Sequence, residues 1–248
     1  MYYREYPPLP ALAAHVECMW AARAPASAHM HRVLPDNCID ILWQDGGQSG
    51  FAVGMMSSAI QVASVAPLRT VAVRFKPGIA IAFLDTPLHA LTDQRADIDL
   101  LWGRGDADRL ADALWSVELP ERARLALIEA QLLQRLRAAG SSRSDALVSR
   151  ALAALDASNG GLRIGELAAG LGVSRQHVAA QFRERVGLSP KLYARIRRFR
   201  RATAALKTGP APDWAQLALE CGYFDQSHLI HEFQEFSGSA PEGFLLAT

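Results

Sequence analysis

The C-terminal part of this chain carries one pattern twice, as IGELAAGLGVSRQHVAAQFRERVGLSPKLY at residues 164–193 and as WAQLALECGYFDQSHLIHEFQEFSGSAPEGF at residues 214–244. The matching positions are small residues, glycines, prolines and apolar anchors: Ala168, Gly172, Val178, Phe182, Gly187, Pro190 and Tyr193 recur as Ala218, Gly222, Leu229, Phe233, Gly238, Pro241 and Phe244. The offset is 50 residues for the first two pairs and 51 for the other five, so one extra residue follows the glycine in the second copy. A small residue, then a glycine, then an apolar anchor about two turns later predict a helix, a tight turn and a second helix. Two such units in tandem are typical of a protein that reads two segments of a DNA groove.

The distribution of charge also favours DNA. The 248-residue chain has a net charge of +1, which taken alone argues against nucleic acid. Residues 143–207, however, hold 13 basic and 4 acidic side chains, whereas residues 208–248 hold no Lys or Arg and 6 acidic side chains. A basic block of this kind is the electrostatic footprint of a phosphate-binding surface.

Composition excludes several other classes of protein. The three cysteines have no regular spacing, so we expect no disulfide scaffold and a reducing cytosol. The start, MYYREYPPLP, is too polar and too rich in proline for a signal peptide. No stretch approaches 18 uninterrupted apolar residues, so we expect no membrane-spanning helix and a cytoplasmic protein.

The expected fold class is α+β, with two domains. Residues 1–139 are predicted to form a β-rich, barrel-like module for sensing or assembly, finished by helices. Its short Val-, Ile-, Phe- and Trp-rich runs are separated by turn signals, and they are 15–22, 33–43, 51–56, 59–65 and 69–75. Residues 140–145 are predicted to be a linker. Residues 146–248 are then an all-α domain with helix–turn–helix units at 162–187 and 213–238, joined by a linking helix.

One helix of the first module has two possible roles. Pro120 opens it, and Leu125, Ile128, Leu132 and Leu136 form a stripe at helical spacing. The stripe either packs on the core of its own module or forms the seam of a homodimer.

Seven helices are expected in the C-terminal domain, in the order 145–157, 164–169, 174–186, 190–207, 213–220, 225–236 and a short one from Pro241. Ser174 and Ser189 are candidate N-caps, and Pro190 suits the first helical position. The linking helix, of about 18 residues, spans roughly 27 Å at 1.5 Å per residue. Neighbouring faces of the DNA major groove lie about 34 Å apart, so this helix is a suitable spacer.

Residues 162–246 resemble the DNA-binding domain of AraC/XylS-type bacterial transcription regulators, over about a third of the chain. Both quoted stretches and the linking helix fit, including the run Asp225-Gln226-Ser227-His228 after the glycine and aromatic residue. The stretches YREYPPLPAL, HRVLPDNCIDILW and VAVRFKPGIAIAFL also resemble an N-terminal module of some family members. The resemblance implies two recognition helices in consecutive major-groove faces of double-stranded DNA, and RNA polymerase as a partner.

The family's base-reading positions fall, in the first unit, on Gln176, Ala179 and Ala180, with Arg175 beside them. Alanine cannot hydrogen-bond a base edge, although it can touch a thymine methyl group. Direct readout by this helix should therefore rest on Gln176 and Arg175, unless Arg175 holds only phosphate.

Contacts with the DNA backbone are expected from six arginines, about half of which should reach phosphate because a helix presents them on several faces: Arg183, Arg185, Arg195, Arg197, Arg198 and Arg201.

The base-reading positions of the second unit fall on four residues, Gln226, Ser227, His228 and His231. This unit departs from the family in charge, with Glu232, Gln234 and Glu235 where many members carry Lys or Arg. Carboxylates near phosphate repel it, so either the first unit anchors the complex or the two histidines supply charge at lower pH.

Other chemical signals are weak. His29-Met30-His31 lacks the Glu that would follow in a metal-binding cupin, and His228 with His231 suits a DNA face better than a metal site. Cys38 lies between Asp36 and Asp40, which raise the pKa of a thiol and oppose reactivity. The chain has no P-loop, no dinucleotide fingerprint and no nucleophile elbow. We therefore expect no enzyme, no cofactor and no metal.

An effector pocket in the first module would be apolar with a few polar anchors, and the candidates are Trp20, Trp43, Phe51, Arg74 and Phe75. Strand core is the competing role for each of them. The sequence thus predicts a transcription regulator, controlled by a small-molecule effector or, alternatively, constitutive or controlled by a partner with a module that only dimerises.

Overall fold

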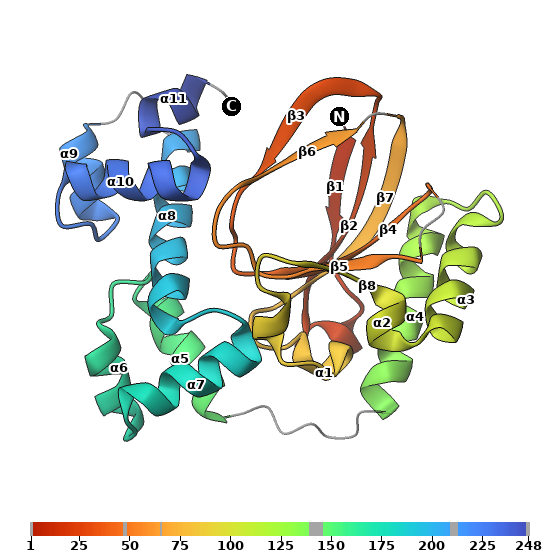
Figure 1. Ribbon diagram of the computed structural model, residues 1–248, viewed down its shortest axis with the longest axis horizontal. Coiled ribbons are helices and arrows are strands. Elements are labelled where there is room, and N and C mark those ends of the chain that lie inside the picture. The colour runs from red at the N-terminus through yellow and green to blue at the C-terminus, as the bar shows by residue number, and fades with distance from the viewer. Residues whose placement is uncertain (1, 47–48, 65, 139–145, 209–212, 247–248) are drawn as a thin grey trace.

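The computed structural model describes residues 2–46, 49–64, 66–138, 146–208 and 213–246. Its N-terminal module is built on an antiparallel six-stranded sheet with the order β1-β2-β7-β4-β5-β8 and a separate two-stranded ribbon, β3-β6 (Figure 1). The strands are β1 (Tyr2–Tyr6), β2 (Val16–Ala24), β3 (Ser27–Val33), β4 (Ile39–Gln44), β5 (Phe51–Val53), β6 (Ile60–Ser64), β7 (Leu68–Phe75) and β8 (Arg95–Asp97). The α+β class is confirmed, and the sheet is open rather than closed into a barrel.

Alternation along the strands gives the sheet two different faces. In β4, Ile39, Ile41 and Trp43 are fully buried in the main core, whereas the residues between them are half-buried. Successive side chains of a strand point to opposite faces, so these three face the helices of the module. The opposite face carries its own small apolar cluster, which includes Cys18 and Trp20.

Helices of the N-terminal module cover the first of these faces. They are α1 (Ile81–Leu84), α2 (Ile98–Trp102), α3 (Arg104–Trp115) and α4 (Glu121–Ala138). Leu125, Ile128 and Leu132 of α4 are buried in the core, and Leu136 packs against it. The stripe predicted for α4 therefore belongs to the core of its own module, and the alternative of a dimer seam along this stripe was wrong.

The described residues of the C-terminal domain, 146–208 and 213–246, form seven helices: α5 (Ala146–Ala157), α6 (Ile164–Leu171), α7 (Arg175–Val186), α8 (Pro190–Thr208), α9 (Trp214–Glu220), α10 (Gln226–Ser237) and α11 (Pro241–Leu246). Figure 1 shows α8 as a long connector, with α6 and α7 at one end and α9 and α10 at the other. The predicted linker 140–145 lies outside the described residues, so the domain boundaries stay a prediction.

Local turn chemistry explains why each helix–turn–helix unit bends where it does. Gly172 and Gly222 have φ of 72° and 83°, a left-handed conformation that a residue without Cβ adopts at little cost. The N-caps follow directly: Ser174 Oγ accepts from His177 N at 3.2 Å, and Asp225 Oδ1 accepts from His228 N at 2.7 Å.

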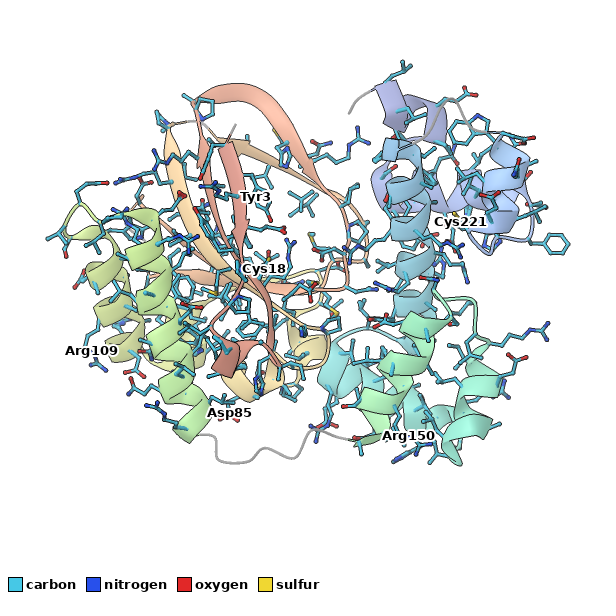
Figure 2. The ribbon with its side chains drawn as sticks, turned by 180° about the vertical axis from the view of Figure 1, so that it is seen from behind. Tyr3, Cys18, Asp85, Arg109, Arg150 and Cys221 are labelled. Carbon is cyan, nitrogen blue, oxygen red and sulfur yellow. The ribbon has the colours of Figure 1, made fainter. Side chains whose placement is uncertain are left out.

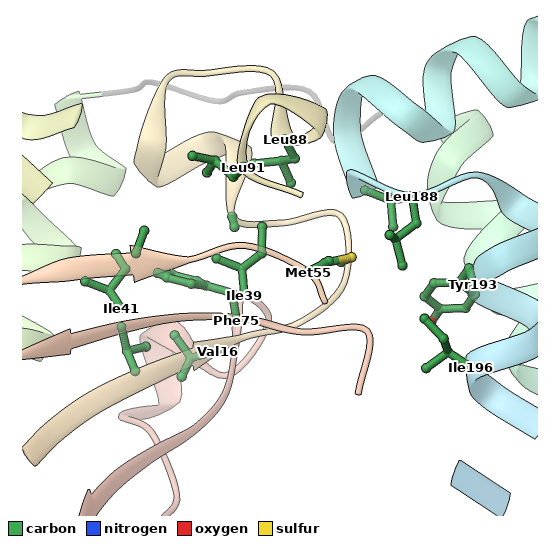
Figure 3. Close-up of a cluster of buried hydrophobic side chains, with 14 of the residues drawn as sticks. Val16, Ile39, Ile41, Met55, Phe75, Leu88, Leu91, Leu188, Tyr193 and Ile196 are labelled. Carbon is green, nitrogen blue, oxygen red and sulfur yellow. The ribbon is translucent and has the colours of Figure 1, made fainter. Parts of the chain in front are cut away.

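The two parts of the molecule share one continuous hydrophobic core. Figure 3 shows Ile39 and Phe75 of the sheet, Met55 and Leu88 near the boundary between the two parts, and Leu188, which precedes α8 in the sequence. Leu88 belongs to a short 3₁₀ helix, Leu88–Leu91, that packs against α7. The module is thus attached by apolar packing as well as by its covalent connection.

Three of the observed strands, β1, β3 and β8, were not predicted from the sequence. β1 is an edge strand with four exposed residues of five, so it lacks the buried alternation by which a strand is recognised. β8 has three residues, too short for a periodic signal. In the described part of the chain, no helix is both long and apolar enough to cross a bilayer.

Gly160 provides a test of the packing between α5 and α8. A Cβ on this residue would lie 2.1 Å from the Ala194 carbonyl oxygen of α8, and its φ is 78°. We expect Gly160→Ala to lower the free energy of unfolding by about 3 kcal/mol, because α8 must shift or the backbone must strain. Gly170, inside α6 with nothing near its Cβ position, is the matched control, and Gly170→Ala should raise stability slightly. Equal effects of the two variants in urea unfolding would contradict this packing.

Candidate nucleic-acid interface

The two recognition helices, α7 and α10, each begin with exposed polar residues. In α7, Arg175, Gln176 and Ala180 are exposed, and Ala179 is half-buried. Val178, Phe182 and Val186 form the buried face of the same helix. The helix therefore keeps its predicted base-reading positions on the solvent side while its apolar stripe holds it to the domain.

The second unit repeats this arrangement. Gln226 and Ser227 are exposed at the start of α10, and the His231 side chain is 75% exposed. His228 is half-buried, because its Nδ1 accepts from Phe224 N at 3.4 Å and its ring packs edge-on against Tyr223. The predicted residues of the second unit thus lie in the first half of α10, as those of the first unit do in α7.

Two acidic residues of the second unit, Glu232 and Glu235, pair with arginines of the linking helix. Glu232 is only 1% exposed and accepts from Arg195 Nε at 2.8 Å and from Arg198 Nη2 at 3.2 Å. Glu235 accepts from Arg195 Nη1 at 2.9 Å. Both arginines belong to α8, so these carboxylates attach α10 to the linking helix. The expectation that Glu232 repels phosphate from the DNA face is therefore corrected.

Three of the six arginines considered for phosphate binding have carboxylate partners within the domain. Arg195 and Arg198 are held by Glu232, and Arg198 also lies over the Tyr223 ring. Arg197 pairs with Asp156 of α5 at 3.0 Å. All three side chains are less than one third exposed, so they are used inside the domain.

The remaining arginines of that row lie nearer to solvent. Arg183 and Arg201 are exposed, and Arg185 is half-buried. The excess of basic over acidic residues in block 143–207 therefore overstates the charge available to DNA, because Arg195 and Arg198 pair with Glu232, which lies outside the block.

Three of the five candidate pocket residues share the sheet face that points away from the helices. Strand register sets Trp20, Ala72, Leu42 and Phe51 side by side across β2, β7, β4 and β5. The next row contains Cys18, Arg74 and Asp40. Figure 2 shows Tyr3 and Cys18 on this part of the sheet.

The other two candidates, Trp43 and Phe75, are wrong as pocket residues. Both are fully buried in the main core on the helix side, and the Trp43 ring lies 5.9 Å from that of Trp102. Phe75 follows Arg74 directly in β7, and adjacent residues of a strand face opposite sides.

The polar centre of the sheet face is a partly buried ion pair. Arg74 donates to both oxygens of Asp40 at 3.0 Å, and its Nη2 lies 3.4 Å from Asp36 Oδ2. The Trp20 indole also donates to Asp40, at 3.1 Å. Burial raises the pKa of Asp40 to about 6, against the opposing pull of Arg74.

The two cysteines of this face, Cys18 and Cys38, are not in surroundings that would make their thiols reactive. Burial is the main reason that the pKa of Cys18 rises to about 12, and burial next to Asp36 and Asp40 also raises that of Cys38. Neither thiol is a ready nucleophile at neutral pH. Among the described side chains, which do not include that of His29, no group of three His, Cys, Asp or Glu could hold a metal ion.

Hydrogen bonds between the module and the C-terminal domain were not predicted. Asn37 is 1% exposed and donates from Nδ2 to the Tyr193 carbonyl oxygen at 3.1 Å, and Arg200 Nη1 donates to the Asp36 carbonyl oxygen at 2.9 Å. The Thr92 hydroxyl donates to the Gly187 carbonyl oxygen at 2.6 Å. These partners are 95 to 164 residues apart in sequence, and no local pattern could have revealed them.

A second group of contacts joins the β3-β6 ribbon to the end of α10. Arg32 Nη1 donates to the Ser237 carbonyl oxygen at 3.1 Å and to Ser239 Oγ at 2.9 Å. Ala59 N donates to the Phe236 carbonyl oxygen at 3.0 Å. The module therefore touches the C-terminal ends of both recognition helices and leaves their N-terminal ends exposed.

Glu232 allows the attachment of α10 to be tested. Replacement by Gln would leave Arg195 and Arg198 without a charged partner, so we expect Glu232→Gln to cost about 3 kcal/mol of unfolding free energy. Glu235→Gln, which affects a partly exposed pair, should cost less than about 1 kcal/mol. Chemical denaturation of the full chain measures both, and a cost for Glu232→Gln no larger than that of the control would contradict the assignment.

Comparison with known proteins yields two family matches. Residues 4–97 match the family described as Domain of unknown function (DUF6597), and residues 167–246 match the family described as Helix-turn-helix domain. No curated protein matches the chain.

Several solved structures of ToxT from Vibrio cholerae are similar to this chain. One at 1.65 Å resolution has 12% identity and a TM-score of 0.49, covering 99% of this chain and 98% of ToxT. ToxT bound to (E)-4-(8-methylnaphthalen-1-yl)but-3-enoic acid has 12% identity and a TM-score of 0.48, covering 91% and 97%. ToxT bound to an unsaturated fatty acid has 11% identity and a TM-score of 0.45, covering 91% and 95%.

The paired recognition helices, the linking helix between them and the two sequence matches lead to one identification. Residues 167–246 are a helix–turn–helix domain of AraC type, and residues 4–97 form a module that matches the DUF6597 family.

Proposed function

We propose that this protein is a sequence-specific transcription regulator of AraC/XylS type that binds double-stranded DNA in the cytoplasm, acts with RNA polymerase and has no enzymatic activity. The observation that carries the proposal is the placement of two recognition helices at the two ends of α8, each with polar residues exposed at its N-terminal end. A recognition helix enters the major groove with its N-terminal residues against the bases.

Base recognition is then divided between the two helices. In α7, Gln176 pairs with a base edge, Arg175 contacts a base or a phosphate, and Ala179 and Ala180 offer only methyl contacts. In α10 the base-reading group comprises Gln226, Ser227, His228 and His231. Gln binds adenine through two hydrogen bonds, and Ser bonds to several bases.

Phosphate binding falls to the arginines that point to solvent. Arg183 and Arg201 are exposed, and Arg185 is half-buried. Such contacts position the protein on the duplex without reading sequence.

Gln176 tests base reading. We expect Gln176→Ala to relax base preference at one position of the half-site bound by α7, because alanine offers no hydrogen bond, at a cost of about 1–3 kcal/mol against the preferred base. Selection of duplexes from random DNA by the wild type and the variant measures this. An unchanged preference at every position would remove Gln176 from the reading group.

A pair of arginine variants tests phosphate binding. Each phosphate contact contributes about 0.9 to the slope of log affinity against log salt concentration, so Arg201→Ala should reduce that slope by about 1. Arg197→Ala is the matched control on the same helix, because Arg197 already pairs with Asp156. If only Arg197→Ala reduced the slope of log affinity against log salt concentration, Arg197 rather than Arg201 would be the phosphate contact.

Effector control is the finer part of the proposal. The sheet face with Trp20, Phe51 and Arg74 offers the apolar wall and single polar centre that small-molecule sites require. Ala22 and Ala72 lie on the same face and form one buried apolar cluster with Trp20.

A continuous chain of contacts leads from this face to the linking helix. Arg74 touches Asp36, whose carbonyl oxygen accepts from Arg200 of α8. The next residue, Asn37, donates to the Tyr193 carbonyl oxygen, also in α8. A ligand that moves Arg74 would thereby change the hold on α8, and with it the relative placement of the recognition helices.

Asn37 separates ligand binding from its effect on DNA. Asn37 has a positive φ of 65°, so Asn37→Gly keeps the backbone conformation and removes only the bond to Tyr193. We expect a metabolite panel to reveal a ligand that raises the melting temperature of both proteins, since binding to the native state stabilises it. The ligand should alter DNA affinity only in the wild type. If the panel yields no stabilising ligand, the alternative of a constitutive or partner-controlled regulator with a dimerising module is favoured.

A further inference from the structure

The two helix–turn–helix units differ by one inserted residue, and the structure identifies it as Phe224. The turns are otherwise the same: Val173 N donates to the Ala168 carbonyl oxygen at 3.1 Å, and Tyr223 N donates to that of Ala218 at 2.8 Å. In the first unit the N-cap follows at once, whereas in the second Phe224 intervenes before the cap.

Phe224 has no place in the core. The apolar position of the turn is already filled by Tyr223, which is 3% exposed and lies under Arg198. The Phe224 side chain is 86% exposed, the most exposed of the large aromatic residues in the described chain. Its backbone N donates to His228 Nδ1, which fixes the residue over the first turn of α10.

This position lies at the end of α10 that would enter the groove. Asp225 caps the helix, and the exposed Gln226 and Ser227 follow. A phenyl ring cannot hydrogen-bond a base edge, and the one apolar group of the major-groove edges is the C5 methyl of thymine. We propose that Phe224, a residue without a counterpart in the first unit, contacts a thymine methyl group in the half-site bound by α10. The proposal rests on DNA binding by this domain.

Leu219 is a matched control. It is 67% exposed and belongs to the same unit, but it lies on α9. The first helix of such a unit crosses the DNA backbone rather than entering the groove. Removal of its side chain should therefore leave base contacts unchanged.

The test uses the full chain and a duplex that the wild type selects from random DNA. Each thymine is replaced in turn by deoxyuridine, which removes only the methyl group. For the wild type we expect one replacement, in the half-site of α10, to weaken binding about fourfold, the factor for one buried methyl. Phe224→Ala should weaken binding to the thymine duplex by at least that factor and should be insensitive to the same replacement. Leu219→Ala should behave as the wild type.

Three outcomes would overturn the proposal: Phe224→Ala binding as tightly as the wild type, Phe224→Ala retaining the sensitivity to deoxyuridine, or no sensitive thymine in the half-site of α10 for the wild type. Normal DNA binding with lost transcription activation in Phe224→Ala would assign the ring to a protein partner instead. If the wild type selects no duplex, DNA binding itself fails, which distinguishes the two failures. Because the side chain is exposed, an unchanged melting temperature verifies that the variant is folded.

Discussion

The ion pairs between Glu232 of α10 and two arginines of α8 hold the second helix–turn–helix unit rigidly on the linking helix. They thereby fix the separation of the two recognition helices. A spacer fixes the distance between recognition helices only if both units are rigidly attached to it. The first unit is attached by the edge-on packing of Phe182 against Tyr193, at 5.4 Å between ring centres. The second adds the buried carboxylate to the packing of Phe199 against Phe233. A buried charge is directional where apolar packing is not, so it also fixes the rotation of α10 about its own axis.

Local chemistry could be predicted from sequence, and long-range pairing could not. The N-cap at Ser174 and the left-handed glycine at 172 follow from propensities that act within a few residues. The role of Arg195 could not be inferred, because its partner is 37 residues away and the residue type fits phosphate equally well. The side of the sheet on which a residue lies could, however, be predicted from the sequence. Arg74 and Phe75 are neighbours in one strand and cannot line the same pocket.

The N-terminal module touches the DNA-binding domain at places that suit control rather than competition. Thr92 binds the backbone just after α7, and Arg32 binds it at the end of α10. Neither contact covers the exposed N-terminal ends of these helices. The module therefore contacts the C-terminal ends of both helices and leaves their N-terminal ends open to solvent.

The shared core has a consequence for the unfolding of this molecule. Gly78 of the module packs against Leu152 of α5 and Val186 of α7, and the buried residues of both parts form one cluster. Separation of the two parts at the connection would expose these apolar side chains to water. The full chain should therefore melt in a single cooperative transition, and a fragment containing only the C-terminal helices should be less soluble than the intact protein unless its newly exposed surface is replaced with polar residues.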